Sequence, residues 1–555
     1  DRHDAERHHD ADVGRRHGSE RPGQLLVRPV RYSACEGGST WGRPLRVFET
    51  SLYLPTMMSS DTGLASFPAV PLRWPSGPVV ATGALAAFVV LAPHLRVSLG
   101  IGLYDVQRLM GLAALVVAVV ALFARSGSVA LHIGWDAMSP VTRWGLGLLA
   151  MLGVFSSALA PRPLYAFAEV GLLFALLGVA VTLAGSWCEQ KGGRAVVEWV
   201  VLSCAVSLSL AVLIRHGVDL ASGGAGWPVD VIGAFTNPRL LNHTQVLILP
   251  ILWGVAARLR TSRSGSTAVW AVRLIAASHI SLIIASGARA ASLSLVVGLV
   301  AAGLVLGQSR RAFLVEAMWA VGLGALGFVG LFGVGGGGVA LHRGGTSGRA
   351  ELWAGAIRMI VDRPWLGIGP MHFSLFDVPD SGVVSPHNVL LQVAAEWGLP
   401  AAVLAVGLVA RGAWAWTRTL RLAPSGDVWP AALSAAAVAG LVDSLFAGTI
   451  GTPVVQVLWV FLLAALLSEY WALRSPVSPI SAQASGRRGL PLVLVLALAP
   501  CAGVVAQDLE GLGERVTVRN ARLDPSLAAG ARFWQIGTIA PPEGPPADRQ
   551  DRYWP

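Results

Sequence analysis

The sequence predicts an all-α membrane protein that crosses the bilayer about 12–13 times, each crossing using roughly 20 apolar residues. Hydrophobic residues make up 54% of the 555 residues, and charged residues only 13%. Soluble domains carry roughly 25% charged residues, so the composition excludes an ordinary soluble protein. Although the net charge of +10 resembles that of nucleic-acid-binding proteins, the arginines lie in short segments between apolar stretches. Arginines in such segments orient a membrane protein, and no nucleic-acid partner is expected.

Residues 1–75 differ from the rest of the chain. They are polar, rich in His and Arg, and aperiodic, and they begin with DRHDAERHHDADVGRRHGSERPG. They lack the basic and apolar regions of a signal peptide. We expect a disordered extension or an over-extended gene start. A His-rich metal-binding tail is the less favoured alternative.

The spans follow from thirteen apolar stretches, each near the length of about 20 residues that a bilayer crossing requires. Nine of them fall in residues 76–334 and four in residues 389–506, separated by a loop at 335–388 and followed by a polar tail at 507–555. The predicted spans are 77–95, 103–124, 144–160, 165–186, 195–214, 240–257, 266–285, 290–307, 312–334, 389–410, 428–447, 452–473 and 489–506.

The short loops predict the orientation. With a cytoplasmic N-terminal side, the inner loops hold most of the basic residues, as the positive-inside rule requires. This orientation places the loop 335–388 outside, together with a second set of arginines that orientation does not need. They are Arg215, Arg239, Arg289, Arg343, Arg349, Arg358 and Arg363. We expect some of these arginines to bind an anion.

The outer loop contains one predicted helix. After the glycine-rich run at 333–348, the segment RAELWAGAIRMIVDRP places Trp353, Ala356, Ile357, Ile360 and Val361 at helical spacing. The pattern predicts an amphipathic helix that lies along the outer membrane surface and ends at the following proline.

The segment SPHNVLLQVAAEWG, residues 385–398, returns the chain to the membrane. Asn388 is placed to cap the next helix. Asn388, Gln392 and Glu396 fall on one helical face, with Glu396 roughly 12 Å along the helix from Asn388. A charge near the middle of a membrane costs at least about 2.5 kcal/mol, so this face should meet protein or a water-filled cavity. His387 is a candidate functional residue, because it lies on the same side as the outer arginines.

Two further outer segments carry polar residues. GAFTNPRLLNHTQ, residues 233–245, places Asn237 and Arg239 at a turn before the sixth span. SGARAAS, residues 286–292, is a short turn that holds Arg289. A lone arginine in such a turn could instead extend to lipid phosphates.

Taken in order, GAFTNP, SGARA, SGRAELW, DRPWLGIGPMHF and SPHNVLLQVAAEWG resemble the O-antigen ligase and polymerase superfamily of bacterial membrane glycosyltransferases. The resemblance covers roughly residues 100–475. It implies a GT-C-like helical architecture in the bacterial inner membrane. It also implies a donor glycan on undecaprenyl diphosphate, a glycolipid, glycan or protein acceptor, a periplasmic active site, and no cofactor or metal.

The resemblance also implies roles for individual residues. The family's essential histidine carries over onto His387 as the catalytic base, and its essential arginines onto Arg289 and Arg349 as the diphosphate-binding residues. The supporting residues are Asn388, Glu396, Asn237 and Arg239. Arginine binds phosphate oxygens in a bidentate manner, and a histidine base is typically worth about 10²–10⁴-fold in rate.

The sequence leaves three hypotheses about function open. The favoured one is a lipid-linked glycan transferase, whether a ligase to lipid A core, a polymerase or a protein glycosylase. A transporter of a small anion such as bicarbonate is the first alternative, but the inverted repeats and broken spans typical of transporters are not visible. A scaffold protein is the second alternative, and the outer arginines and His387 disfavour it.

Overall fold

The computed structural model describes residues 76–95, 103–122, 125–190, 192–223, 238–262, 266–305, 310–332, 349–373, 385–422, 427–474 and 489–522. The chain divides into two units, Asp1–Leu72 and Arg73–Pro555, and every described residue belongs to the second. The N-terminal extension expected at 1–75 and most of the polar tail lie outside the described residues.

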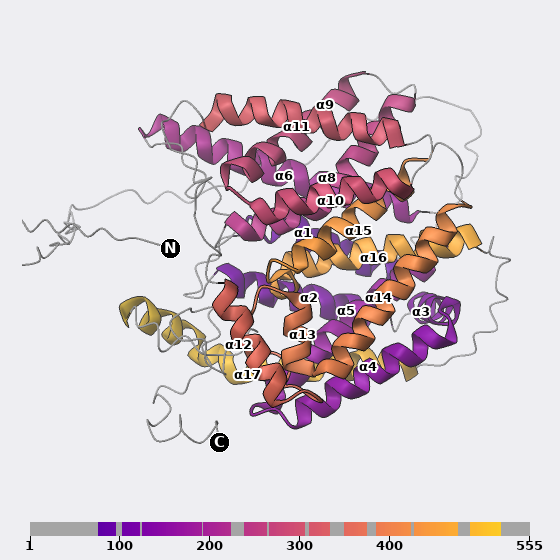
Figure 1. Ribbon diagram of the computed structural model, residues 1–555, viewed down its shortest axis with the longest axis vertical. Helices are drawn as coiled ribbons and strands as arrows, with labels where there is room; N and C mark the ends of the chain where they lie inside the picture. The colour runs from indigo at the N-terminus through magenta and orange to yellow at the C-terminus, as the bar shows by residue number, and fades with distance from the viewer. Residues whose placement is uncertain are drawn as a thin grey trace, which may run out of the picture. The chain divides into compact units, whose positions relative to one another are not determined.

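The described residues form sixteen α-helices and one short 3-10 helix, with no strand among them (Figure 1). The helices are α1 (Gly77–Leu91), α2 (Leu103–Ala121), α3 (Arg125–Ala137), α4 (Pro140–Ala158), α5 (Pro163–Gln190), α6 (Gly193–Ala221), α8 (Pro238–Thr261), α9 (Ser266–Ala285), α10 (Arg289–Val305), α11 (Arg310–Phe332), α12 (Arg349–Asp362), α13 (Val389–Trp397), α14 (Leu399–Leu420), α15 (Trp429–Ser444), η3 (Thr449–Gly451), α16 (Pro453–Arg474) and α17 (Gly489–Arg522).

The all-α polytopic membrane fold is confirmed. Ten of these helices are long and apolar enough to cross a membrane: α2, α4, α5, α6, α8, α9, α11, α14, α16 and α17. The other three predicted spans correspond to α1, α10 and α15, which have 15, 17 and 16 residues. At 1.5 Å per residue these are roughly 22–26 Å long, shorter than the hydrocarbon layer of about 30 Å.

The predicted span 389–410 is broken, which the hydropathy pattern did not reveal. Gly398 separates α13 from α14 with a φ of 90°, a conformation that side chains with a Cβ rarely adopt. A Cβ at Gly398 would also collide with the carbonyl oxygen of Trp365. Pro400 then lies in the first turn of α14, where its missing N–H is harmless. The break follows from this glycine and the backbone packed against it.

The structure also has one helix that was not predicted and one helix that is longer than predicted. Residues 125–137 form α3, although they were predicted as a connection between spans. Gly134 on α3 and Gly185 on α5 each lie against backbone of the other helix, so the two helices pack at close range. At the other end of the chain, α17 continues to Arg522, past the predicted boundary at residue 506.

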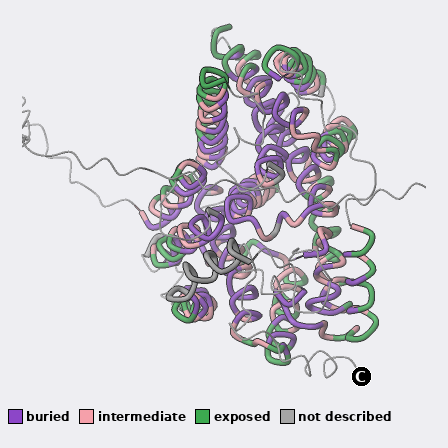
Figure 2. Tube along the Cα trace, turned by 90° about the vertical axis from the view of Figure 1, so that its left-hand side faces the viewer, coloured by how far each residue is buried: buried purple, intermediate pink, exposed green. Residues whose placement is uncertain are grey.

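Small residues set the packing of the spans. Gly171 and Gly178 bring α5 against α17, and Gly298 brings α10 against Ala435 of α15. Such close helix approach is typical of membrane bundles, where dispersion contacts replace the hydrophobic effect. In Figure 2 the buried residues line the contacts between helices, while exposed residues lie on their outward faces.

The helix predicted from RAELWAGAIRMIVDRP is confirmed as α12, and only part of its apolar surface packs on protein. Leu352, Ala356 and Met359 are buried against α13 and its neighbours. Ile357 and Val361, which belong to the predicted apolar face, are 52% and 72% exposed. Because α12 packs on protein as well as presenting apolar side chains outward, one hydrophobic stripe could not describe it.

Candidate active site

His387 lies in a tight turn immediately before α13. Its backbone has a φ of 51°, in the left-handed region that non-glycine residues seldom occupy. Its ring is half-buried beside Gly448, since a Cβ at Gly448 would lie 3.4 Å from His387 Nδ1 and 2.9 Å from Ser385 Oγ. Backbone strain of this kind is common at functional sites, and here it aims an imidazole at the turn that follows α15.

A hydrogen bond connects α12 to the His387 turn. Trp353 Nε1 donates to the carbonyl oxygen of Pro386 at 3.0 Å. Arg349 lies one helical turn before Trp353, on the same side of α12. Helices α12 and α13 also pack side by side (Figure 1). This contact brings the N-terminal turn of α12, which begins with Arg349, towards His387.

The polar stripe on α13 has a structural role that explains much of its sequence. Asn388 caps the helix, its Oδ1 accepting from the backbone N–H groups of Leu390 and Leu391 at 3.0 and 3.1 Å. Glu396 is fully buried, and its Oε1 accepts from the backbone N–H of Phe373 at 3.0 Å. As predicted, the stripe faces protein. Glu396 therefore anchors the segment after α12 to α13.

A second chain of contacts connects the Arg289 turn to the same region. Ser286 Oγ donates to Asn242 Oδ1 of α8 at 3.1 Å, and Arg289 begins α10 three residues after Ser286. The neighbouring His243 contacts Asp443 of α15, with 2.7 Å between Nδ1 and Oδ2. These contacts place the start of α8, the start of α10 and the end of α15 together.

The chain of contacts continues from α15 to His387. Ser444 Oγ lies 2.8 Å from Thr449 Oγ1, which closes the turn containing Gly448. From the other side, Arg108 of α2 donates to the carbonyl oxygen of Gly451 and, at 2.7 Å, to Gln456 Oε1. The turn beside His387 is thus held by both α15 and α2. We call the end of the bundle defined by His243, Arg289, His387 and Asp443 the His387 end.

Most of the predicted site residues are placed at helix starts of the His387 end. Arg289 is the first residue of α10 and exposed, Arg349 is the first residue of α12 and half-buried, and Asn388 caps α13. Arg239 belongs to the first turn of α8, and Asn237 lies outside the described residues. Helix N-termini carry free N–H groups and favour anions.

Sequence reasoning missed three buried polar residues at this end, namely His243, Asp443 and Arg108. Their exposed fractions are 8%, 1% and 4%. Each is an ionisable residue within an apolar helix. Such residues in membrane segments are expensive and therefore usually functional or paired, and this signal could have identified them.

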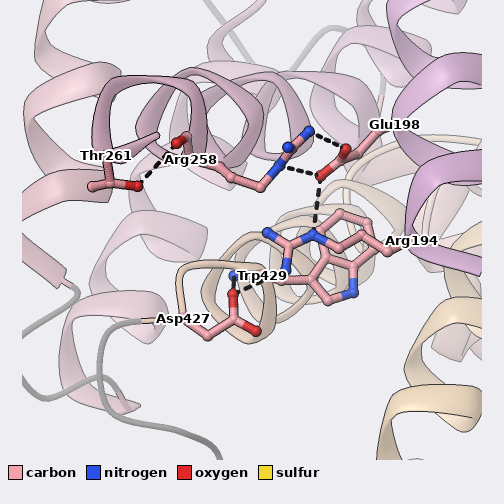
Figure 3. A network of polar contacts seen from close by, with 6 residues as sticks. All are labelled: Arg194, Glu198, Arg258, Thr261, Asp427 and Trp429. Atoms are coloured by element: carbon pink, nitrogen blue, oxygen red, sulfur yellow. Dashed lines mark hydrogen bonds and ion pairs between the residues drawn. The ribbon is translucent and has the colours of Figure 1, made fainter. Parts of the chain in front are cut away.

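The opposite end of α8 and α15 holds a different cluster (Figure 3). Glu198 of α6 accepts from Arg194 Nε at 3.1 Å and from Arg258 Nε at 3.0 Å, and also contacts Arg258 Nη2. Arg194 reaches Asp427 at 3.1 Å and lies over the ring of Trp429. We call this the Glu198 end; here the charged groups are paired with one another.

Comparison with known protein families finds a match over part of the chain. Residues 274–406 match the O-antigen ligase family, and no curated protein matches the chain. The matched region includes Arg289, Arg349 and His387. It extends from within α9 to within α14, so it covers α12 and the break between α13 and α14. The match supports a membrane glycosyltransferase of the ligase or polymerase type. Over residues 274–406 the chain is thus similar to the O-antigen ligase family, in agreement with the resemblance that the ordered motifs indicated.

Proposed function

We propose that this protein transfers a glycan from undecaprenyl diphosphate to an acceptor hydroxyl on the periplasmic face of the inner membrane. The acceptor oxygen bonds to the anomeric carbon while the bond from that carbon to the diphosphate oxygen breaks. The electron pair leaves with the diphosphate, and the hydroxyl proton passes to a base. Direct displacement of this kind inverts the anomeric centre. Ligation of O-antigen and polymerisation of surface polysaccharide are both reactions of this type.

Arg289 and Arg349 bind the diphosphate in this proposal. Each begins a helix, so the free N–H groups of α10 and α12 add to the positive field of the guanidinium groups. Arginine remains charged and matches phosphate oxygens with two parallel hydrogen bonds. The two residues would neutralise the charge that develops on the leaving diphosphate, a role that needs no metal ion.

His387 is the proposed base. Its half-buried ring suits a group that must meet an acceptor, and its turn, with a backbone φ of 51°, places the ring beside Gly448. A histidine near neutral pH can accept a hydroxyl proton in the transition state. The missing side chain of Gly448 leaves room for Ser385 Oγ, since a Cβ there would lie 2.9 Å from this oxygen.

The observation that supports the proposal most strongly is that separate contacts lead to His387 from both arginine-bearing segments. Trp353 connects the Arg349 helix to Pro386. Asn242 and the His243–Asp443 contact connect the Arg289 turn to the end of α15. These contacts support the proposal that three helix starts, far apart in the chain, act on one substrate.

The proposal is tested by deleting the gene and examining surface polysaccharide and lipid-linked glycan. We expect loss of the modified or polymerised product and accumulation of donor. Complementation should fail with His387→Ala, Arg289→Ala and Arg349→Ala, and should succeed with the control His132→Ala, a half-buried histidine of α3 outside the matched region. Normal glycans combined with defective anion uptake would refute the transferase and favour the transporter.

Glycan chain length separates the two main reactions. A ligase defect leaves full-length polymer on the carrier, whereas a polymerase defect leaves single repeat units. With purified protein, a chelator such as EDTA should leave the transfer rate unchanged, and a loss of activity restored by a divalent cation would contradict the assigned role of the arginines.

A further inference from the structure

One carboxylate–imidazole pair at the His387 end has no role in the reaction described above. His243 of α8 and Asp443 of α15 approach to 2.7 Å between Nδ1 and Oδ2. Their side chains are only 9% and 2% exposed. Buried ionisable pairs in membrane helices are costly unless they are needed, so this contact requires an explanation.

The pair lies between the two segments that carry the proposed catalytic groups. On the α8 side, the adjacent Asn242 holds Ser286, in the turn that leads into Arg289. On the α15 side, the adjacent Ser444 holds Thr449, which follows Gly448, the glycine beside His387. Successive residues of a helix point about 100° apart, so His243 and Asn242 can face different neighbours.

Below this contact, α8 and α15 are packed closely through small residues. A Cβ at Gly254 would lie 2.6 Å from the Cβ of Ala432, and a Cβ at Gly440 would lie 2.6 Å from Cδ2 of Leu247. Apolar contacts of this kind are not directional. A hydrogen bond between His243 and Asp443 fixes the register of the two helices where the apolar packing ends.

We propose that His243 is a positioning residue: by donating from Nδ1 to Asp443, it sets the Arg289 turn and the His387 turn at the spacing that glycan transfer requires. The function of His243 is donation of a hydrogen bond and not acceptance of a proton. This inference rests on the proposed function, because it concerns the spacing of groups that act on the same substrate.

Substitutions at position 243 can distinguish hydrogen-bond donation by His243 from proton acceptance by its ring. An asparagine side chain at position 243 can place its Nδ2–H group where Nδ1–H of the imidazole lies, but it cannot accept a proton at neutral pH. A glutamine places its amide nitrogen nearer to Nε2 and loses the contact with Asp443. Alanine loses both nitrogens. The three variants therefore separate hydrogen-bond donation from base chemistry.

The test uses full-length protein in lipid nanodiscs with a lipid-linked glycan donor and an acceptor. kcat and KM for the donor are measured for wild type, His243→Asn, His243→Gln and His243→Ala, at a temperature where all remain folded by thermal unfolding. We expect His243→Asn to keep kcat within about 3-fold, while Gln and Ala lower kcat by roughly 10²-fold, as small misplacements of reacting groups do.

Two results would overturn the inference. The first is a His243→Asn enzyme as inactive as His243→Ala although folded, which would show that the imidazole transfers a proton. The second is wild-type kcat in both Gln and Ala variants, which would show that the contact is dispensable. If His243→Ala does not fold, the comparison of the near-isosteric Asn and Gln variants still decides between these results.

The same experiment separates a failure of this inference from a failure of the proposed function. Wild type and His387→Ala are measured alongside the other variants. No transfer by wild type, or full transfer by His387→Ala, counts against the proposed function. An active wild type and an inactive His387→Ala, together with an inactive His243→Asn, count against the positioning role alone.

Discussion

Helices α8 and α15 are connected at both ends, and the two connections use different chemistry. At the Glu198 end, Arg258 of α8 and Asp427 before α15 meet through Arg194 and Glu198 of α6 (Figure 3). At the His387 end, His243 contacts Asp443 directly. From residue 243 to residue 258 of α8 is roughly 22 Å at 1.5 Å per residue, so these are opposite ends of the same pair.

The difference suggests that the Glu198 end contributes mainly to stability and the His387 end mainly to the proposed function. The Glu198 end consists of guanidinium–carboxylate pairs, in which two arginines share one glutamate. Glu316 of α11 adds a second such group, accepting from Arg273 at 2.7 and 2.9 Å and lying 3.4 Å from Arg260. Groups that satisfy each other's charge are suited to holding helices together. At the His387 end, Arg289 and Arg349 each begin a helix, and in the proposed function they meet a charged substrate.

The largest expected effect tests this division with one substitution made at both ends. Arg349→Lys and Arg289→Lys keep the charge but lose bidentate phosphate binding, so each should lower the transfer rate by roughly 10²-fold. Arg258→Lys at the Glu198 end should leave kcat unchanged. The rate of donor turnover is measured for all three purified lysine variants. A normal rate for both Arg289→Lys and Arg349→Lys would contradict the assignment of function to the His387 end.

Glu316→Gln should give the largest loss of stability. Removing the charge of a fully buried carboxylate leaves Arg273, which is 8% exposed, without its ion pair. Breaking a buried pair in this way costs about 3–5 kcal/mol of folding free energy. Thermal unfolding of the purified protein measures the loss. The surviving folded enzyme should retain its kcat, and a selective loss of kcat would place catalytic function at the Glu198 end.

Glu198→Gln should destabilise the protein less. Its side chain is 12% exposed and Arg258 is 40% exposed, so water partly replaces the lost contacts. We expect a loss of about 1–3 kcal/mol, the range for leaving a hydrogen-bonded charged group without its partner. The double variant Glu198→Gln/Arg258→Gln should recover part of that loss, and failure to recover any would show that the two residues do not interact.

The smallest expected effect concerns the cap of α13. Asn388→Ala removes the acceptor for the Leu390 and Leu391 N–H groups and should cost about 1 kcal/mol of stability. Asn388→Asp keeps the acceptor and should restore the unfolding temperature. A kcat loss of Asn388→Ala that Asn388→Asp does not restore would instead give Asn388 a role in the reaction.

Much of the fold and part of the site could be read from local pattern. Each of the thirteen predicted stretches falls on a helix, ten of them long and apolar enough to cross a membrane, and the helical spacing of 349–362 gave α12. Asn388 was recognised as a cap because capping depends on neighbours a few residues away. The break at Gly398 was not predicted, because it depends on the carbonyl oxygen of Trp365, which is distant in sequence.

The sequence by itself determined that this is a polytopic helical membrane protein, because apolar length and low charge are properties of each local stretch of chain. It also supplied Arg289, Arg349 and His387 as candidates through an ordered series of short motifs. Only the tertiary structure decided that Glu396 anchors backbone and that His243 meets Asp443 from 200 residues away. Contacts of this kind depend on how helices cross and rotate against one another, and no local periodicity encodes that.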